Sequence, residues 1–92
     1  ELTNEYIVDM KRLSAVSFHN RGLCYLDLWN IEEAIIAFKD CIKISEESNF
    51  IDYLVPCYCS LSFAFSCIGY LEQAFYFARE SERKIKATKL SV

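Results

Sequence analysis

The side chains best suited to nucleophilic or metal chemistry are five cysteines and a single histidine, His19. A cysteine nucleophile needs a general base within hydrogen-bond reach, and Cys24 is the cysteine nearest to His19 in the sequence. Five residues along a helix rotate one side chain from the other by about 140°, so this pair is not expected to meet. A zinc site would need a tighter pair of cysteine pairs. We therefore expect no catalytic cysteine, no metal and no cofactor.

The cysteines are expected to be reduced, buried and used as small apolar side chains. Their number is odd and each stands in an apolar stretch, whereas secreted disulfide domains place cysteines in polar loops. Cys57 and Cys59 come closest to a motif, but on a helix their side chains point about 200° apart. A reducing compartment follows, which is the cytoplasm or the nucleus. The five residues are Cys24, Cys41, Cys57, Cys59 and Cys67.

The acidic pairs offer no better case for catalysis. Glu32–Glu33 and Glu46–Glu47 are neighbours in sequence on polar faces, which is typical of solvated charge at helix ends and not of an acid–base couple. The chain has no glycine-rich phosphate loop. The sequence thus predicts a protein that is not an enzyme.

Length and composition indicate one small folded domain over residues 1–92. Hydrophobic residues make up 53% and aromatic residues 15% of the chain, which excludes a disordered protein. Two glycines and one proline are too few for a turn-rich β-sandwich. Because the first residue is Glu1, we expect either a processed chain or a piece of a longer protein, whose missing neighbours would explain the excess of apolar residues.

Membrane insertion and nucleic-acid binding are both disfavoured. No apolar run approaches the length of a membrane-spanning helix, and no signal-peptide pattern opens the chain. The formal net charge is −3, which argues against nucleic acid as the main partner. Basic residues gather only in residues 78–89. They fit either a solvated last helix, whose dipole favours cations near its C-terminus, or a docking patch.

The hydrophobic spacing predicts an all-α fold of four to five helices. Thr3 or Asn4, Asn30, and Asn49 or Asp52 are the candidate N-caps. Pro56 is expected near the start of its helix, and Trp29 is expected to pack over the turn before Asn30. The predicted helices cover residues 15–28, 31–45, 53–68 and 70–87, and residues 1–14 form either a separate short helix or the front of the first one.

Each of the last three helices carries a stripe of apolar residues that we expect to face the core. The predicted inward residues are Ile31, Ala34, Ile35, Phe38, Cys41 and Ile42 on the first of these helices. On the second they are Leu54, Cys57, Tyr58, Leu61, Phe65 and Ile68. On the third they are Leu71, Ala74, Phe75, Ala78 and Ile85.

The chain contains an internal repeat, because NIEEAIIAF at 30–38 returns as YLEQAFYFA at 70–78. Placing Ala34 over Ala74 also places Gly22 over Ser62. The same offset of 40 residues places Tyr25 over Phe65, Trp29 over Gly69 and Ile31 over Leu71. The pattern therefore predicts two antiparallel helix–turn–helix units, at residues 15–48 and 52–87, the second with a C-terminal tail.

This pattern resembles the tetratricopeptide repeat (TPR) family, in which an aromatic-x2-Leu-Gly-x2-Tyr helix A is followed by an Ala-x3-Phe helix B. Small residues at the Gly and Ala positions allow the two helices to approach closely. The first unit reads Phe18-x2-Arg21-Gly22-x2-Tyr25 and then Ala34-x3-Phe38. The second reads Tyr58-x2-Leu61-Ser62-x2-Phe65 and then Ala74-x3-Ala78, with Gly69-Tyr70 at the turn.

The chain departs from the family pattern at four residues and in its spacing. Arg21 replaces the Leu of the pattern, Ala78 replaces the aromatic residue, and Glu46 and Lys86 replace the closing Pro. The repeat spacing of 40 residues exceeds the usual spacing of about 34. It is similar to the longer TPR variants of cell-polarity adaptors, kinesin light chains and bacterial peptide-sensing regulators. The resemblance implies an α-solenoid fragment.

The resemblance also implies a protein-binding groove lined by the A helices. No lysine lies in residues 15–28 or 53–68, so a clamp for a carboxylate terminus is disfavoured, and the mostly apolar groove suits an amphipathic helix or peptide. By the family register the groove residues are Val16, His19, Asn20, Leu23, Leu26, Asp27, Cys59, Ser60, Phe63, Ser66 and Cys67.

Two other functions stay open. A repeat stack needs about three units for stability, so an uncapped end here favours contact with neighbouring repeats or with a second copy of the chain. The domain would then serve oligomerisation or subunit assembly. The third and weaker alternative is the peptide-sensing domain of a regulator.

Overall fold

The computed structural model describes residues 3–90, the last two by their backbone alone. These residues form four helices and no strand, so the predicted all-α class is confirmed. Residues 4–14 continue directly into the helix predicted at 15–28, which leaves four helices instead of five. Residues 1, 2, 91 and 92 of the predicted domain lie outside this range. The helices are α1 (Asn4–Asp27), α2 (Ile31–Glu47), α3 (Ile51–Cys67) and α4 (Leu71–Leu90).

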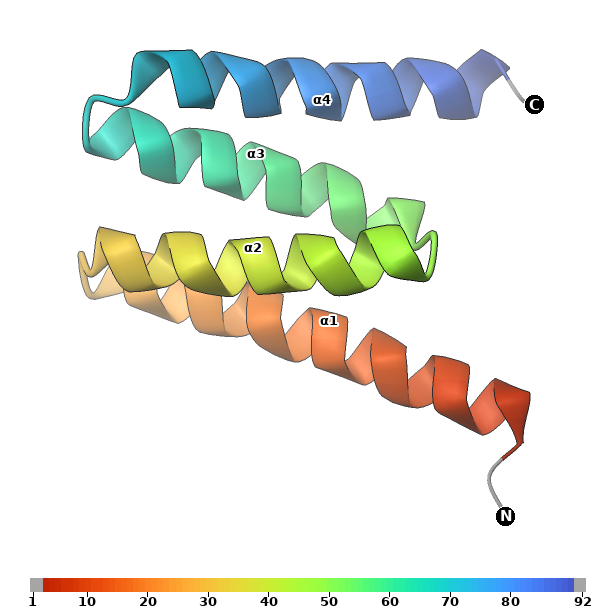
Figure 1. Cartoon of the computed structure of the whole chain (residues 1–92). Coiled ribbons are helices and arrows are strands. Elements are labelled where there is room, and N and C mark those ends of the chain that lie inside the picture. Colours follow the sequence, from red (N-terminus) through yellow and green to blue (C-terminus); the bar gives the residue numbers. More distant parts are fainter. Residues whose placement is uncertain (1–2, 91–92) are drawn as a thin grey trace.

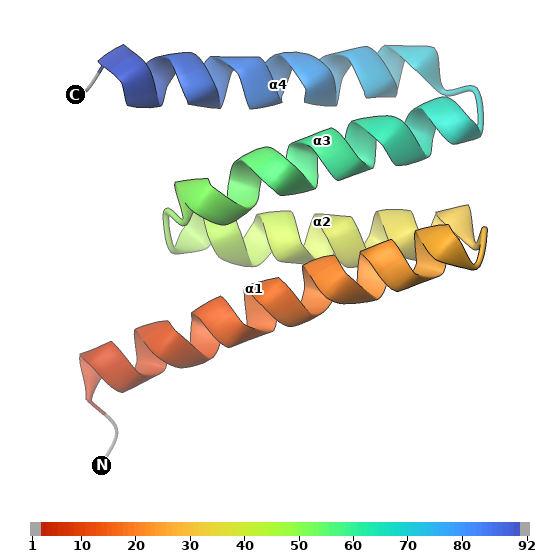
Figure 2. The same cartoon turned by 180° about the vertical axis from the view of Figure 1, so that it is seen from behind.

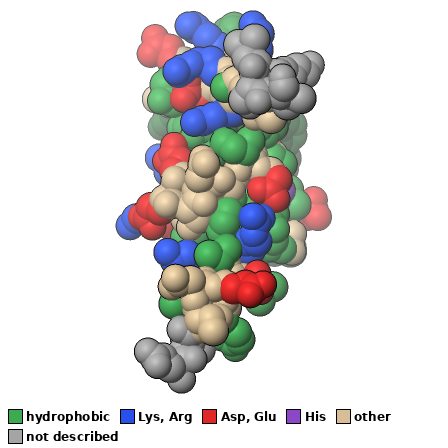
Figure 3. All heavy atoms as spheres, turned by 90° about the vertical axis from the view of Figure 1, so that its right-hand side faces the viewer, with side chains coloured by type: hydrophobic (Ala, Val, Ile, Leu, Met, Phe, Trp, Pro, Cys, Tyr) green, Lys and Arg blue, Asp and Glu red, His purple; other side chains and the backbone are tan. Residues whose placement is uncertain are grey.

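The helices run up and down as two hairpins, α1–α2 and α3–α4 (Figure 1). Each helix packs on its neighbour in sequence, and α1 also touches α3. Within the described residues α4 packs on α3 alone. The result is a thin body of 46 × 33 × 16 Å, which Figure 3 shows from its narrow side. The reverse view in Figure 2 shows the same order of helices from α1 to α4.

The three turns share one backbone geometry. The second residue after the end of α1, α2 and α3 has a positive φ, at Trp29 (61°), Asn49 (57°) and Gly69 (82°). In the first turn the N–H of Asn30 donates to the carbonyl of Tyr25 (2.8 Å), and in the last turn the N–H of Tyr70 donates to that of Phe65 (2.9 Å). These bonds are those of the Schellman motif, which satisfies the last carbonyls of a helix. The predicted breaks at 29–30 and at Gly69 therefore have a common physical cause.

Replacing Trp29 with Gly is expected to stabilise the domain. A bulky side chain at positive φ costs about 1–2 kcal/mol of backbone strain. Packing of the Trp29 side chain offsets little of this cost, because Trp29 has φ 61° and is 70% exposed. We expect Trp29→Gly to raise the free energy of unfolding by about 1 kcal/mol in a urea titration. The reciprocal change, Gly69→Trp, should lower it by a similar amount. A destabilised Trp29→Gly variant would show that the indole makes contacts that outweigh the backbone strain.

Trp29 and several predicted caps differ from expectation. Trp29 does not cover the turn but points into solvent, because its backbone conformation turns the side chain outward. Asn30 occupies the N-cap of α2 without a side-chain bond, and Phe50, instead of Asn49 or Asp52, occupies that of α3. Thr3 is confirmed, since its hydroxyl accepts from the Tyr6 N–H at 3.1 Å.

The core lies where α2 and α3 meet their neighbours. All six predicted inward residues of α2 are buried, with Ala34, Phe38 and Cys41 at zero exposure. On α3 the prediction is confirmed for Leu54, Cys57, Tyr58, Leu61 and Phe65. It is wrong for Ile68, which is 37% exposed because it follows the last residue of α3 and stands in the turn.

The predicted inward face of α4 is largely wrong. Only Ala74 is buried, and Leu71, Phe75, Ala78 and Ile85 are exposed. The reason is that α2 is covered by α1 on one side and α3 on the other, whereas α4 has one neighbour. The face that meets α3 instead carries Ala74, the half-buried Phe77 and the buried Ser81.

An aromatic stack fastens α4 to α3. The ring of Phe77 lies 5.8 Å from that of Phe65 and 6.1 Å from that of Tyr58, and both pairs are nearly parallel. Tyr70 stacks on Phe65 at 6.2 Å, across the turn. The Ser62 hydroxyl also donates to the carbonyl of Ala74 at 2.7 Å, so a small side chain at Ser62 lets the backbones approach. These contacts hold the second hairpin together.

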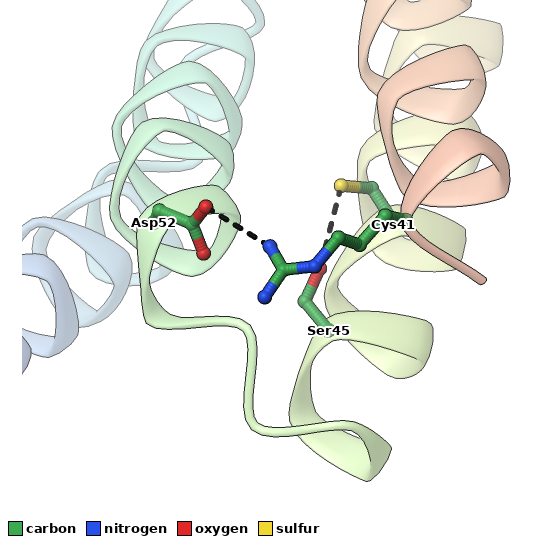
Figure 4. A network of polar contacts seen from close by, with 4 residues as sticks. Cys41, Ser45 and Asp52 are labelled. Atoms are coloured by element: carbon green, nitrogen blue, oxygen red, sulfur yellow. Dashed lines mark hydrogen bonds and ion pairs between the residues drawn. The ribbon is translucent and has the colours of Figure 1, made fainter. Parts of the chain in front are cut away.

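Arg12 joins the first helix to the second hairpin. Its guanidinium lies 3.2 Å from the Asp52 carboxylate, and Figure 4 marks this ion pair with a dashed line. The same guanidinium lies 4.3 Å from the centre of the Phe50 ring. The ion pair is exposed on both sides, so its net contribution is small. The contact with the ring orients the N-terminal half of α1, whose apolar side chains are otherwise exposed. These are Tyr6, Ile7, Val8, Met10 and Leu13.

Candidate functional site

The eleven predicted groove residues all lie on α1 and α3, the two helices that touch without being neighbours in sequence. None of them is fully buried. Leu23 is 39% exposed and Phe63 is 56% exposed, so each helix contributes one large exposed apolar side chain to the predicted groove. Asn20, Asp27, Cys59 and Ser66 are also exposed, and the half-buried members are Val16, His19, Leu26, Ser60 and Cys67.

His19 and Ser60 bridge the two helices of this face. The Nε2 atom of His19 lies 3.2 Å from the hydroxyl of Ser60, within hydrogen-bond distance. The imidazole also packs against the buried Phe38 ring of α2, with 5.7 Å between ring centres. His19 is therefore a structural link between the hairpins, with one edge open to the face.

Acidification is expected to destabilise the domain through His19. Burial disfavours the imidazolium and lowers the pKa of His19 below its ordinary 6.5. The unfolded chain thus binds the proton more readily. The contribution of neutral His19 to the free energy of unfolding is fully present above the pKa of the unfolded chain. It falls as the pH drops through that pKa toward the lower pKa of the folded state. We expect Tm to fall between about pH 7.5 and about pH 5.5, and to fall less in His19→Gln. Equal falls in both proteins would assign the effect to other groups.

Two of the predicted groove residues have partners that turn them away from the face. The thiol of Cys59 lies 3.2 Å from the hydroxyl of Ser81 on α4. Ser66 donates to the carbonyl of Phe63 on its own helix at 2.7 Å. The remaining apolar and polar members stay available, and Leu23 and Phe63 are the most prominent of them.

A second exposed apolar surface lies on α4, and we call it the α4 face. It carries Leu71 (63% exposed), Phe75 (68%) and Tyr76 (58%). Beside them is an open depression of about 470 Å³ lined by Glu72, Phe75, Tyr76, Arg79, Glu80 and Arg83. The repeat offset equates Leu71 and Phe75 with Ile31 and Ile35, which are buried on α2. The α4 face thus has the composition of an interface without a covering helix.

The basic segment of α4 is compensated by acids on the same helix. Arg83 pairs with Glu80, and Lys86 pairs with Glu82 at 2.8 Å. The pair with Lys86 lowers the pKa of Glu82 and raises that of Lys86. Figure 3 shows basic and acidic side chains interleaved toward the α4 end of the molecule. This is the arrangement of a solvated helix, one of the two interpretations of residues 78–89.

The cysteines only partly follow the prediction. All five are free thiols, and Cys41 and Cys57 are fully buried. Cys24 on α1 and Cys59 on α3 are exposed, and Cys67 is half-buried. Within the described residues no three His, Cys, Asp or Glu side chains are placed to hold a metal ion.

Three features of this region were missed by sequence reasoning. Phe77 was overlooked because Leu71, Phe75 and Ala78, at i, i+4 and i+7, indicate a helix face as well as Ala74, Phe77 and Ser81 do at i, i+3 and i+7. The contact of Arg12 with Phe50 joins residues far apart in sequence and leaves no local signal. The thiols of Cys41 and Cys57 lie 2.7 Å apart, and their inward positions were the only available hint.

Comparison with known proteins finds no matching protein-family model, no matching curated protein and no matching solved structure. No helix among the described residues is both long and apolar enough to span a bilayer. The surfaces themselves therefore carry the functional argument.

Proposed function

We propose that this domain is a non-enzymatic protein-interaction module of the TPR type, which binds a partner helix or peptide across the face of α1 and α3. One observation carries the proposal: Leu23 on α1 and Phe63 on α3 are exposed, and each lies about one helical turn beyond the contact of His19 with Ser60 that joins these helices. Packed helices lie about 8–10 Å apart, which leaves a furrow between their side chains. An amphipathic helix can lay its apolar side chains into such a furrow.

The composition of the face supports this type of partner. Large apolar anchors at the centre of an interface supply most of its binding energy, and polar groups at the rim exclude water. Leu23 and Phe63 would provide the anchors, and Asn20 and Asp27 the rim. The reduced cysteines favour a cytoplasmic or nuclear setting. A module of this kind would act as a scaffold within a protein complex, and sensing a short peptide is a narrower version of the same activity.

The test is a displayed library of amphipathic helical peptides, selected on the wild-type domain. We expect selected peptides to lose at least tenfold in affinity for Leu23→Glu/Phe63→Glu, which keeps its fold because both positions are exposed. Circular dichroism checks the fold. The matched control is Leu71→Glu/Phe75→Glu on the α4 face, which should bind normally. Peptides that bind all three proteins equally would refute the proposal.

The α4 face favours a second candidate function, assembly with neighbouring repeats or with another copy of the chain. The observation is that Leu71 and Phe75 are exposed where the equivalent Ile31 and Ile35 are covered. Size-exclusion chromatography with light scattering separates the two candidates. If the wild type is a dimer and only the Leu71→Glu/Phe75→Glu variant is a monomer, assembly occurs through α4. If only the Leu23→Glu/Phe63→Glu variant is a monomer, self-association occurs through α1 and α3.

A further inference from the structure

The two buried thiols, Cys41 on α2 and Cys57 on α3, face each other across the contact between the hairpins. Their sulfur atoms lie 2.7 Å apart, and neither residue has any exposed surface. A disulfide bond length is about 2.05 Å, so the sulfurs need to move only a few tenths of an ångström toward each other. A bond between these two sulfurs would join the two hairpins.

The pKa values of the two thiols are shifted in opposite directions by their surroundings. The Cys57 thiol donates to the sulfur of Cys41, which lowers the pKa of Cys41 and raises that of Cys57. The Ser45 hydroxyl lies 3.9 Å from the Cys41 sulfur on the same helix and also favours its thiolate (Figure 4). A thiolate is the form that reacts with peroxides. Cys41 is therefore the nucleophile of the pair, and Cys57 holds the proton.

We propose that Cys41 and Cys57 form a reversible disulfide when the protein meets a small peroxide, and that this bond locks the first hairpin to the second. The Cys41 thiolate attacks one oxygen of hydrogen peroxide, the O–O bond breaks, and hydroxide leaves to give a sulfenic acid. The Cys57 sulfur then attacks the sulfur of the sulfenic acid, its proton goes to the departing hydroxyl, and water leaves. The hydroxide takes up the proton that Cys41 lost when it became a thiolate, so in total two thiols are oxidised to one disulfide and one peroxide is reduced to two waters.

Access to the buried pair comes through local opening of α3. Pro56 precedes Cys57 inside this helix and has no N–H, so the carbonyl one turn earlier, at Asp52, lacks its usual partner. The first turns of α3 are therefore more easily opened than its remainder. Because opening must come first, the pair should react more slowly than the exposed Cys24 and Cys59.

The bond would change the behaviour of the whole domain. It closes a loop from residue 41 to residue 57 that includes the α2–α3 turn. Cross-linking a loop of this size restricts the unfolded chain and should raise Tm by roughly 10 °C. It also fixes how α3 sits relative to α2, so the spacing between α1 and α3 becomes less adjustable.

The test uses Cys24→Ser/Cys59→Ser/Cys67→Ser, which retains only the two buried thiols. After treatment with hydrogen peroxide, the protein is denatured and labelled with N-ethylmaleimide. We expect no label, an intact mass lower by about 2 Da, and a raised Tm that dithiothreitol reverses. Adding Cys57→Ala should leave Cys41 unable to close a bond within the chain, so no rise in Tm should follow.

Wild-type protein provides the second measurement in case the triple variant folds poorly. Peptide mapping after peroxide treatment should find residues 41 and 57 linked within one chain. Two labelled thiols, or oxygen added to either sulfur without a cross-link, would overturn the proposal. A link only between chains would overturn it as well.

Discussion

Ala34→Arg is expected to abolish folding of the domain at 25 °C. Ala34 has no exposed surface and lies on α2, between α1 and α3, so a guanidinium there has no path to water. Burying an unpaired charge and overfilling a packed site together cost more than about 4 kcal/mol. A domain of this size has little more than that to lose. Far-ultraviolet circular dichroism should show loss of the helical signal.

The matched control is Ile36→Arg, two residues away on the exposed side of α2. Ile36 is 55% exposed, so this change should alter stability by less than about 0.5 kcal/mol. Ala74→Arg on α4 should have an intermediate effect, because Ala74 retains 9% exposure and α4 has only one neighbour. If the melting temperature of Ala34→Arg were unchanged, the alignment of Ala34 with the close crossing of α1 and α2 would be wrong.

Gly22→Ala is expected to destabilise the domain by about 2 kcal/mol, although alanine is the better helix former. A Cβ atom on Gly22 would lie 2.4 Å from Cε1 of Phe38 and 2.6 Å from its Cδ1. The Phe38 ring has no exposed surface and cannot swing aside without displacing the core. A urea titration measures the loss as a lower midpoint.

Two further variants test the cause of that loss. Asn20→Ala, at an exposed position on the same helix, should be neutral or slightly stabilising. In a Phe38→Leu background the smaller side chain leaves room for the new methyl group, so Gly22→Ala should cost less there. If the cost of Gly22→Ala were the same in both backgrounds, the clash with Phe38 would not be its cause.

The fold class was predictable because the spacing of apolar residues along a short stretch of sequence indicates a helix. The spacing of Ile31, Ala34, Ile35 and Phe38 identified the buried side of α2, and it did so because that helix has neighbours on both sides. The same kind of spacing gave the wrong buried face for α4. Apolar residues occur on more than one face of this helix, and the number of helices that cover it decides which face is buried. Hydrophobic periodicity measures what a helix could bury, and only the tertiary arrangement decides what it does bury.

The candidate site was predictable to a smaller extent. The residues of the α1 and α3 face were named from the register of the repeat family that the sequence resembles, and Leu23 and Phe63 were among them. Contacts that join distant segments could not, because Arg12 with Phe50, His19 with Ser60 and Cys41 with Cys57 each depend on how two helices slide past one another. A shift of one residue between α1 and α3 would break the first two contacts, and the same shift between α2 and α3 would break the third.

The packing of each helix mainly on its sequence neighbours determines how the domain assembles and comes apart. Contacts that close over short stretches of chain form quickly, so we expect fast folding through either hairpin. The helix with a single neighbour, α4, can detach while α1, α2 and α3 stay together. Amide protons of α4 should therefore exchange with solvent before those of α2. We therefore expect the molecule to lose its contacts first at the end formed by α4 and last around α2, as in a short row of units that each contact only their neighbours.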